Sequence, residues 1–193
     1  MIYKTAAENN EDGKKDWRAK NNLGVVYLEL NKNDEAKTAL NEAKNLKDNE
    51  TVKNNLAVVA LRANKLNEAE ELMNTAGASD DVKYNLGTVK IIKGAYADAI
   101  NNFGNQVVIN AALAKLLSKQ NDEALSTLNS VKGDDALASY LKAIVGARKG
   151  DNDLLMNNLR TACSKSADLK KRAKTDVEFA KYFQDSTFKS IVN

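Results

Sequence analysis

Apolar residues recur three and four positions apart along most of the chain, which is the period of an amphipathic helix. Ala, Leu, Lys, Glu and Asn fill these windows, glycine is scarce and proline is absent, so the sequence predicts an all-α protein. Only Val107-Val108-Ile109 would open a strand by propensity. We expect a helix there too, because an isolated strand would have no partner to pair with.

A longer spacing is superimposed on the helical period. Gly24 and Ala36 lie twelve residues apart, Leu40 follows four residues later, and Ala43 three after that. Four further registers share this pattern in whole or in part: Ala57, Ala69, Met73 and Ala76; Gly87, Ala99 and Phe103; Ala112, Ala124, Leu128 and Val131; and Ala143, Leu155, Leu159 and Ala162. The first residue of each register is called its marker below. Five registers indicate five repeats of one structural unit.

Short polar segments inside each register predict a tight turn between two helices. The turn pairs are Asn31-Lys32, Asn64-Lys65, Gly94-Ala95, Lys119-Gln120 and Gly150-Asp151. Four of the five contain Gly or Asn, which suit a left-handed turn. A short polar residue, placed to cap or charge a helix start, stands one or two positions before the second residue of each register: Asp34, Asn67, Asp98, Asp122 and Asp153. Each register is therefore predicted to be helix, tight turn, helix.

Small residues at facing positions explain the spacing. Gly or Ala on both helices lets the axes approach at the short end of the ~8–10 Å range, while Leu40, Met73 and Phe103 fill the flanking space. One helix pair cannot bury its apolar face alone, so the pairs are expected to stack on their neighbours. An irregular helical bundle is the alternative, but five matches to one spacing favour stacked repeats.

The stretch NNLGVVYLELNKNDEAKTALNEAKNL resembles the tetratricopeptide repeat (TPR). The residues that carry the likeness are Leu23, Gly24, Tyr27, Ala36, Leu40 and Ala43, and YNLGTVKIIKGAYADAINNF is a second clear copy. The resemblance implies a right-handed α-solenoid of stacked helix-turn-helix repeats with a helical C-terminal cap. The chain departs from the family in two ways. Successive markers are 33, 30, 25 and 31 residues apart, against the family's repeat of about 34 residues, and the usual proline is missing.

The resemblance also gives a domain organisation. We expect one TPR-like domain over 1–193, with five repeats in 17–162 and capping helices in 163–193. Phe179, Phe183 and Phe188 would form the apolar side of the cap. Residues 1–12 look like the remnant of a truncated repeat, so we expect a piece of a longer bacterial protein. Similar Asn/Lys-rich repeats in envelope-associated proteins imply the cell envelope or periplasm, although the chain carries no targeting signal.

Composition excludes several classes of function. The chain has 29 basic and 26 acidic residues, interleaved along its length, which argues against a nucleic-acid partner. No histidine is present and Cys163 is the single cysteine, so a hydrolytic triad or a cysteine metal cluster is not expected. No apolar run is long enough for a membrane span. We therefore expect no enzyme, no cofactor, no metal and no membrane insertion.

What remains is recognition of a protein or peptide. In the family, the first helices line a concave groove, and the residues three before and one after each marker point into it. The resemblance therefore implies a groove lined by Asn21, Val25, Asn54, Val58, Tyr84, Thr88 and Tyr140, with Arg62 and Arg148 as its cations. Amides paired with apolar pockets suit a peptide. The family's clamp for chaperone C-termini is not expected, because Asp81 and Asn85 stand where its basic pair would be.

The leading hypothesis is thus a protein-interaction scaffold. The alternatives are the non-catalytic module of an enzyme whose catalytic domain lies elsewhere, and an RNA-binding helical repeat. For the scaffold we expect Asn54→Ala with Tyr84→Ala to weaken partner capture without lowering the melting temperature.

Overall fold

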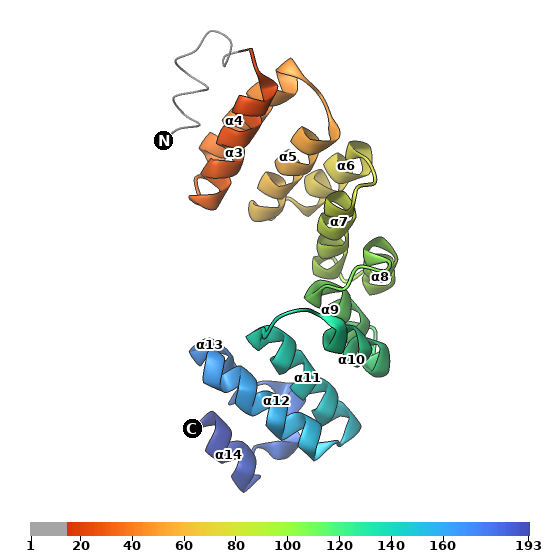
Figure 1. The fold of residues 1–193 in the computed structure, drawn as a ribbon, viewed down its shortest axis with the longest axis vertical. Coiled ribbons are helices and arrows are strands. Elements are labelled where there is room, and N and C mark those ends of the chain that lie inside the picture. Colours follow the sequence, from red (N-terminus) through yellow and green to blue (C-terminus); the bar gives the residue numbers. More distant parts are fainter. Residues whose placement is uncertain (1–14) are drawn as a thin grey trace. The chain divides into compact units, whose positions relative to one another are not determined.

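The computed structural model describes residues 15–193, and these form helices and turns without any strand (Figure 1). The chain divides into two compact units, Met1–Ala95 and Tyr96–Asn193, called unit 1 and unit 2. The described helices of unit 1 are α3 (Trp17–Glu29), α4 (Asn33–Leu46), α5 (Glu50–Arg62), α6 (Leu66–Ala76) and α7 (Asp80–Ile92). Those of unit 2 are α8 (Tyr96–Phe103), α9 (Ile109–Leu117), α10 (Asn121–Ser130), α11 (Ala136–Lys149), α12 (Asn152–Lys165), α13 (Ala167–Ala173), the 3-10 helix η1 (Val177–Tyr182) and α14 (Ser186–Val192).

The helices pack in consecutive pairs, as the twelve-residue spacing predicted. Helix α3 packs on α4 and α5 on α6 in unit 1, while α9 packs on α10 and α11 on α12 in unit 2. The stretch around Val107, with its strand propensity, leads into α9, so its helical prediction is confirmed. The predicted fold class, all-α with TPR-like helix pairs and a helical C-terminal cap, is therefore confirmed.

All five predicted turns contain a residue in the left-handed region. The φ angles are 57° at Asn31, 56° at Asn64, 77° at Gly94, 63° at Lys119 and 71° at Gly150. The amide nitrogen of the next residue then donates to the carbonyl oxygen five positions earlier, at 2.8 to 2.9 Å. This bond closes the end of the first helix in each pair. Lys119 adopts the conformation although it is neither glycine nor asparagine.

Side-chain caps lie at the first helix of a pair more often than the sequence pattern indicated. Asp34 and Asp122 lie in the first turn of α4 and α10, where they complement the helix dipole, but the N-cap residues there make no side-chain cap bond. Four of the five first helices are capped instead, by the side chains of Asp16, Asn49, Ser79 and Asp135; α9 has no side-chain cap, and the second helix α12 is capped by Asp151. These four caps stand outside the repeated register, so the twelve-residue spacing does not predict them.

The small residues of the registers form the tightest part of the core. Ala36, Ala57 and Ala143 are fully buried. A Cβ atom added to Gly24 would lie 2.5 Å from Leu40 Cγ, so α3 and α4 touch there without room for a methyl group. Trp17 and Tyr27 pack, partly buried, against the cluster that holds Ala36 and Leu40.

The C-terminal helices complete the core of unit 2. Phe179 and Phe188 are 0% and 1% exposed, and Phe183 packs partly buried against the same cluster. Their rings lie near one another, with centroids 5.8 Å apart for Phe179 and Phe188 and 6.0 Å for Phe183 and Phe188. The prediction that these three residues form the apolar side of a cap is confirmed.

The unit boundary falls in the third predicted repeat. Unit 1 ends at Ala95 and α8 begins at Tyr96, so the two helices of that register belong to different units. One continuous domain over 1–193 stays a prediction. The predicted remnant repeat at 1–12 lies outside the described residues.

Candidate peptide-binding surfaces

The first helices of unit 1 are joined by two asparagine pairs. Asn55 Nδ2 donates to Asn21 Oδ1 at 2.8 Å, which links α5 to α3. Asn85 Nδ2 donates to Asn54 Oδ1 at 3.0 Å, which links α7 to α5. In both pairs the acceptor stands three residues before its marker and the donor two before the next marker, so the pairs are equivalent. Two of the predicted groove residues thus set the spacing of α3, α5 and α7.

The asparagine pairs leave further hydrogen-bonding groups. Three side-chain atoms make no hydrogen bond to any of residues 15–193: Nδ2 of Asn54 and the Oδ1 atoms of Asn55 and Asn85. All three side chains are partly exposed. A donor and two acceptors on neighbouring helices match the alternating groups of an extended peptide backbone.

Apolar and aromatic side chains accompany these amides. Val25, Val58 and Thr88 are partly exposed on α3, α5 and α7, and Tyr84 is 37% exposed. Asn21 is buried at 5% exposure, because its amide lies between helices. The predicted groove positions of unit 1 therefore differ in access, and those on α5 and α7 are more accessible than Asn21.

Arg62 and Arg148 hold neighbouring repeats together. Arg62 donates through Nη1 to the backbone oxygen of Leu28, and Arg148 Nη1 donates to that of Leu116 at 2.7 Å. Each arginine stands five residues after its marker (62 − 57 and 148 − 143). Each leucine stands four after the preceding marker (28 − 24 and 116 − 112). Arg62 and Arg148 thus share one position relative to the marker, and this is the sequence signal from which the hydrogen bond between repeats could have been predicted.

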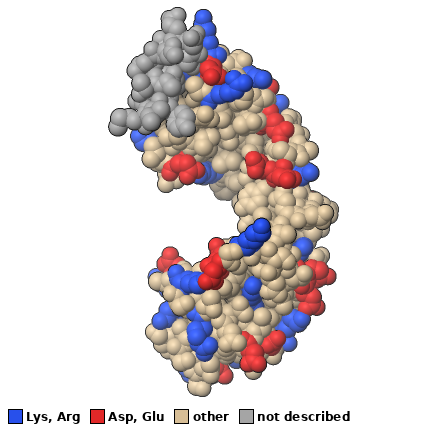
Figure 2. Space-filling model, viewed as in Figure 1, with Lys and Arg blue, Asp and Glu red and all other residues tan. Residues whose placement is uncertain are grey.

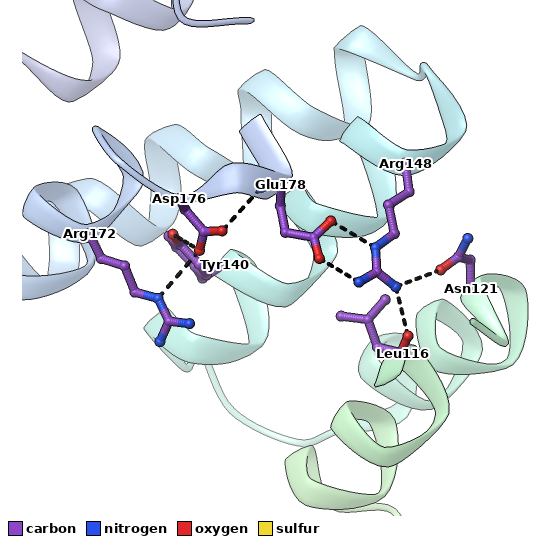
Figure 3. A network of polar contacts seen from close by, with 7 residues as sticks. All are labelled: Leu116, Asn121, Tyr140, Arg148, Arg172, Asp176 and Glu178. Carbon is purple, nitrogen blue, oxygen red and sulfur yellow. Dashed lines mark hydrogen bonds and ion pairs between the residues drawn. The ribbon is translucent and has the colours of Figure 1, made fainter. Parts of the chain in front are cut away.

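In unit 2 the equivalent helix face is covered by the chain itself (Figure 3). Glu178 of η1 accepts from Arg148 of α11 with both carboxylate oxygens, at 2.8 Å from Nε and 2.5 Å from Nη2. This fork raises the pKa of Arg148, because the carboxylate favours the charged guanidinium. Arg148 is therefore fixed between η1 and the end of α9.

Tyr140 lies beneath the same segment. Its hydroxyl donates to Asp176 Oδ2 at 2.8 Å, and Arg172 Nε donates to the same oxygen at 3.3 Å (Figure 3). The Phe179 ring packs against the Tyr140 ring at 80°, with centroids 5.5 Å apart. Burial and then the bond to Asp176 raise the pKa of Tyr140. At 1% exposure Tyr140 is not accessible to a partner in this structure, so here this predicted groove residue contacts the chain's own C-terminal segment.

Charges elsewhere are mixed and locally paired. Lysines and acidic residues are interspersed over the visible face of the molecule (Figure 2). Lys90 and Lys93 of α7 both bind Glu70 of α6, at 2.8 and 2.5 Å, and these donors lower the pKa of Glu70. Burial raises the pKa of the Cys163 thiol. Residues 15–193 hold no group of three acidic or cysteine side chains placed to bind a metal, and no helix among them is long and apolar enough to cross a membrane.

Helix pairs, left-handed turns and linked first helices define an all-α repeat protein. Residues 18–50 match the tetratricopeptide repeat family, over α3, α4 and the start of α5. No curated protein matches the chain significantly in sequence.

Solved structures with the same fold include three bacterial TPR proteins. YrrB, a TPR protein with an unusual peptide-binding site, is 21% identical, with 90% of this chain and 98% of that chain covered and a TM-score of 0.58. PilW, a type IV pilus biogenesis factor, is 16% identical over 99% and 91% of the two chains, with a TM-score of 0.67. PilF of Pseudomonas aeruginosa is 18% identical over 93% and 85%, with a TM-score of 0.66. At these identities the likeness establishes the fold.

Proposed function

We propose that the chain is a non-catalytic protein-interaction module, and that α3, α5 and α7 of unit 1 bind an extended peptide. The observation that carries the proposal comes from α11 of unit 2. There the positions three before and five after the marker, Tyr140 and Arg148, contact a polypeptide segment. In unit 1 the same two positions on α5 are occupied by Asn54 and Arg62. Asn54 is hydrogen-bonded to Asn85 of α7, the sequence neighbour of the exposed Tyr84.

The chemistry of the surface supports a peptide rather than another ligand. Asn54, Asn55 and Asn85 offer both donors and acceptors for a backbone, and Val58 and Tyr84 offer apolar contacts for its side chains. The unusual peptide-binding site of YrrB, which shares the fold, supports the same function by analogy.

The experiment begins with a phage-displayed peptide library selected on the whole chain. Affinities of the selected peptides are then measured for wild type, for Tyr84→Ala and for Lys37→Ala, a control at an exposed residue of α4. We expect Tyr84→Ala to weaken binding about tenfold or more, as an aromatic contact residue does, and Lys37→Ala to leave it unchanged. Equal affinity of wild type and Tyr84→Ala would contradict the proposal.

Salt dependence separates this function from binding of RNA. A peptide held by amides and apolar contacts keeps most of its affinity when salt is raised. Affinity for an RNA strand would instead fall steeply, because phosphate contacts release counterions. A steep fall for an RNA probe that binds the whole chain would favour the RNA-binding alternative.

We further propose that the module works within a larger bacterial protein at the cell envelope. The role of PilW, a protein of the same fold, as a type IV pilus biogenesis factor supports this placement by analogy. Fractionation of the native cells and the mass of the native polypeptide test it. Recovery of a polypeptide of this length from the cytoplasm alone would contradict it.

A further inference from the structure

The segment at 176–179 is anchored on α11 by three of its four residues. Asp176 accepts from the Tyr140 hydroxyl, Glu178 forks the Arg148 guanidinium, and the Phe179 ring is fully buried against Tyr140. Val177, between the two acids, is 82% exposed. The two acidic side chains and the aromatic ring are therefore bound by residues of α11, whereas Val177 faces solvent.

The α11 surface has the chemistry of a site that reads a sequence. A guanidinium that forks a carboxylate recognises an acidic side chain with defined geometry. A phenol hydroxyl and Arg172 hold the second carboxylate, whose side chain is 9% exposed. The Phe179 ring is fully buried against the rings of Tyr140 and of Phe188 in α14, and a buried aromatic ring is the kind of anchor that dominates binding at protein interfaces.

We propose that this α11 surface is a binding site for segments of the pattern acidic, any residue, acidic, aromatic, and that residues 176–179 are its built-in occupant. In this chain the pattern is Asp-Val-Glu-Phe. When residues 176–179, called the tail below, leave the α11 surface, a partner with the same pattern would make the same contacts. The inference concerns unit 2; it starts from the same α11 contacts that support the proposal for unit 1, but its experiment tests unit 2 alone.

The tether explains how the intact chain keeps the site closed. A segment joined through the short α13 competes at an effective concentration in the millimolar range, far above that of a typical partner. The apparent affinity for a partner is reduced by the fraction of molecules in which the tail is released. Weakening the tail without altering α11 should therefore raise the affinity for a peptide in trans.

The test uses a labelled synthetic peptide of residues 174–185, Lys-Thr-Asp-Val-Glu-Phe-Ala-Lys-Tyr-Phe-Gln-Asp, and the full chain carrying Glu178→Lys. This substitution breaks the fork to Arg148 within the chain, whereas the peptide still carries its glutamate. We expect the variant to bind the peptide at least about tenfold more tightly than wild type does. A peptide with alanine at the positions of Glu178 and Phe179 should lose the gain.

Glu71→Lys is the matched control. It makes the same charge change at an exposed residue of α6 whose side chain makes no hydrogen bond or ion pair with residues 15–193, so it reports any general attraction of the acidic peptide to a more basic protein. Its affinity should equal that of wild type. A gain in Glu71→Lys as large as that in Glu178→Lys would overturn the proposal, and so would a folded Glu178→Lys protein that binds no more tightly than wild type.

A second measurement needs no variant and covers the case in which Glu178→Lys does not fold. Hydrogen exchange of the wild-type chain compares the amides of residues 177–182 with those in the middle of α11, such as Val145. We expect the tail amides to exchange faster, through local release that leaves α11 intact. Equal protection of both segments would show one cooperative unit and would overturn the proposal.

Discussion

Arg62 of α5 donates a hydrogen bond to the backbone oxygen of Leu28, one residue before α3 ends. Carbonyl groups in the last turn of a helix lack the usual intrahelical partners and carry the negative end of the helix dipole. The Leu28 oxygen also accepts from the Asn31 amide nitrogen at 3.0 Å, so the guanidinium adds a second, charged donor that neutralises the end of the neighbouring first helix. Arg148 does the same at Leu116 of α9, so the contact is a repeated device of the fold.

Removal of the Arg62 side chain should loosen α5 from α3. We expect Arg62→Ala to lower the free energy of unfolding of unit 1 by about 1 kcal/mol, which is less than a buried charged hydrogen bond contributes, because the side chain is exposed. Urea unfolding followed by the fluorescence of Trp17, the single tryptophan, measures this change. Lys37→Ala, an exposed lysine of α4, should change it by less than about 0.5 kcal/mol. Equal effects of the two substitutions would contradict the interpretation.

Asn54 is a structural residue as well as a candidate contact. Its carbonyl accepts from Asn85, so Asn54→Ala leaves a part-buried amide donor without that partner. We expect the substitution to lower the free energy of unfolding of unit 1 by about 1 kcal/mol. The sequence-based expectation was that Asn54→Ala with Tyr84→Ala would leave the melting temperature unchanged. The hydrogen bond to Asn85, which the register alone did not reveal, now predicts a lower melting temperature.

A double-mutant cycle with Asn85→Ala measures the pairing directly. If the hydrogen bond carries the effect, the two single losses should not add in the double variant. Additive losses in Trp17 fluorescence unfolding would show that the two amides act separately.

The repeated register predicted most of the fold because it records backbone packing. Gly24, Ala36 and their counterparts are small for one reason, the close approach of paired helices, so one spacing identified the pairs and the turns between them. The hydrogen bonds of the asparagine pairs and of Arg62 and Arg148 depend instead on side chains that extend from one repeat to the next. Their offsets from the marker are visible in the sequence, but nothing in a single sequence says which groups they meet.

Lys119 tests the cost of a left-handed residue in these turns. At φ 63° its Cβ crowds the following backbone, whereas Gly94 and Gly150 adopt the same region without that cost. We expect Lys119→Gly to raise the stability of unit 2 by about 0.5–1 kcal/mol. Hydrogen exchange of the α9 and α10 amides measures the gain. Lys119→Ala keeps the Cβ and should show no gain; an equal gain would indicate loss of the lysine side chain as the cause.

Tyr140 gives unit 2 a dependence on alkaline pH. Its pKa is raised in the folded state, so its contribution to stability is complete below the ordinary value of 10.0 and is lost as pH rises above that value. The loss should be no more than about 1.4 kcal/mol per pH unit. Alkaline titration of tyrosinate absorbance in the folded chain should show one tyrosine that ionises above the ordinary pKa of 10.0.

Tyr140→Phe identifies the group. The late-ionising tyrosine should disappear, and the stability difference between wild type and variant should shrink above pH 10.0. Because every other titrating group is shared by the two proteins, the difference isolates Tyr140. Persistence of the late ionisation in Tyr140→Phe would assign it to another tyrosine.

The site in unit 2 could be predicted in part. The family resemblance implied that Tyr140 and Arg148, on the first helix of the last repeat, line a groove for a partner, and in the structure both contact a segment of this chain. That the segment would be residues 176–179 was not predictable, because its contacts with α11 span 30 to 36 residues of sequence. The phenylalanines of the cap were expected from apolar spacing, while the partners of Asp176 and Glu178 required the folded chain.

Gly146 marks a tighter helix contact than the marker residues do. An added Cβ would lie 2.5 Å from the backbone nitrogen of Leu155 and 3.0 Å from the backbone oxygen of Asp151. At Gly24 the nearest atoms, at 2.5 and 2.8 Å, belong to the side chain of Leu40, which can rotate. A backbone cannot move aside in this way, so the two glycines should respond differently to the same substitution.

We expect Gly146→Ala to destabilise unit 2 by about 3 kcal/mol or more, and Gly24→Ala to destabilise unit 1 by about 1 kcal/mol. Helix propensity alone would give a gain of up to about 1 kcal/mol at both sites, so a loss measures the packing conflict. Denaturant unfolding followed by circular dichroism and by Trp17 fluorescence assigns each change to its unit. Gly146→Ser should be at least as costly as Gly146→Ala, since it adds the same Cβ. A stabilising Gly146→Ala would mean that α11 and α12 lie further apart than the Leu155 contact indicates.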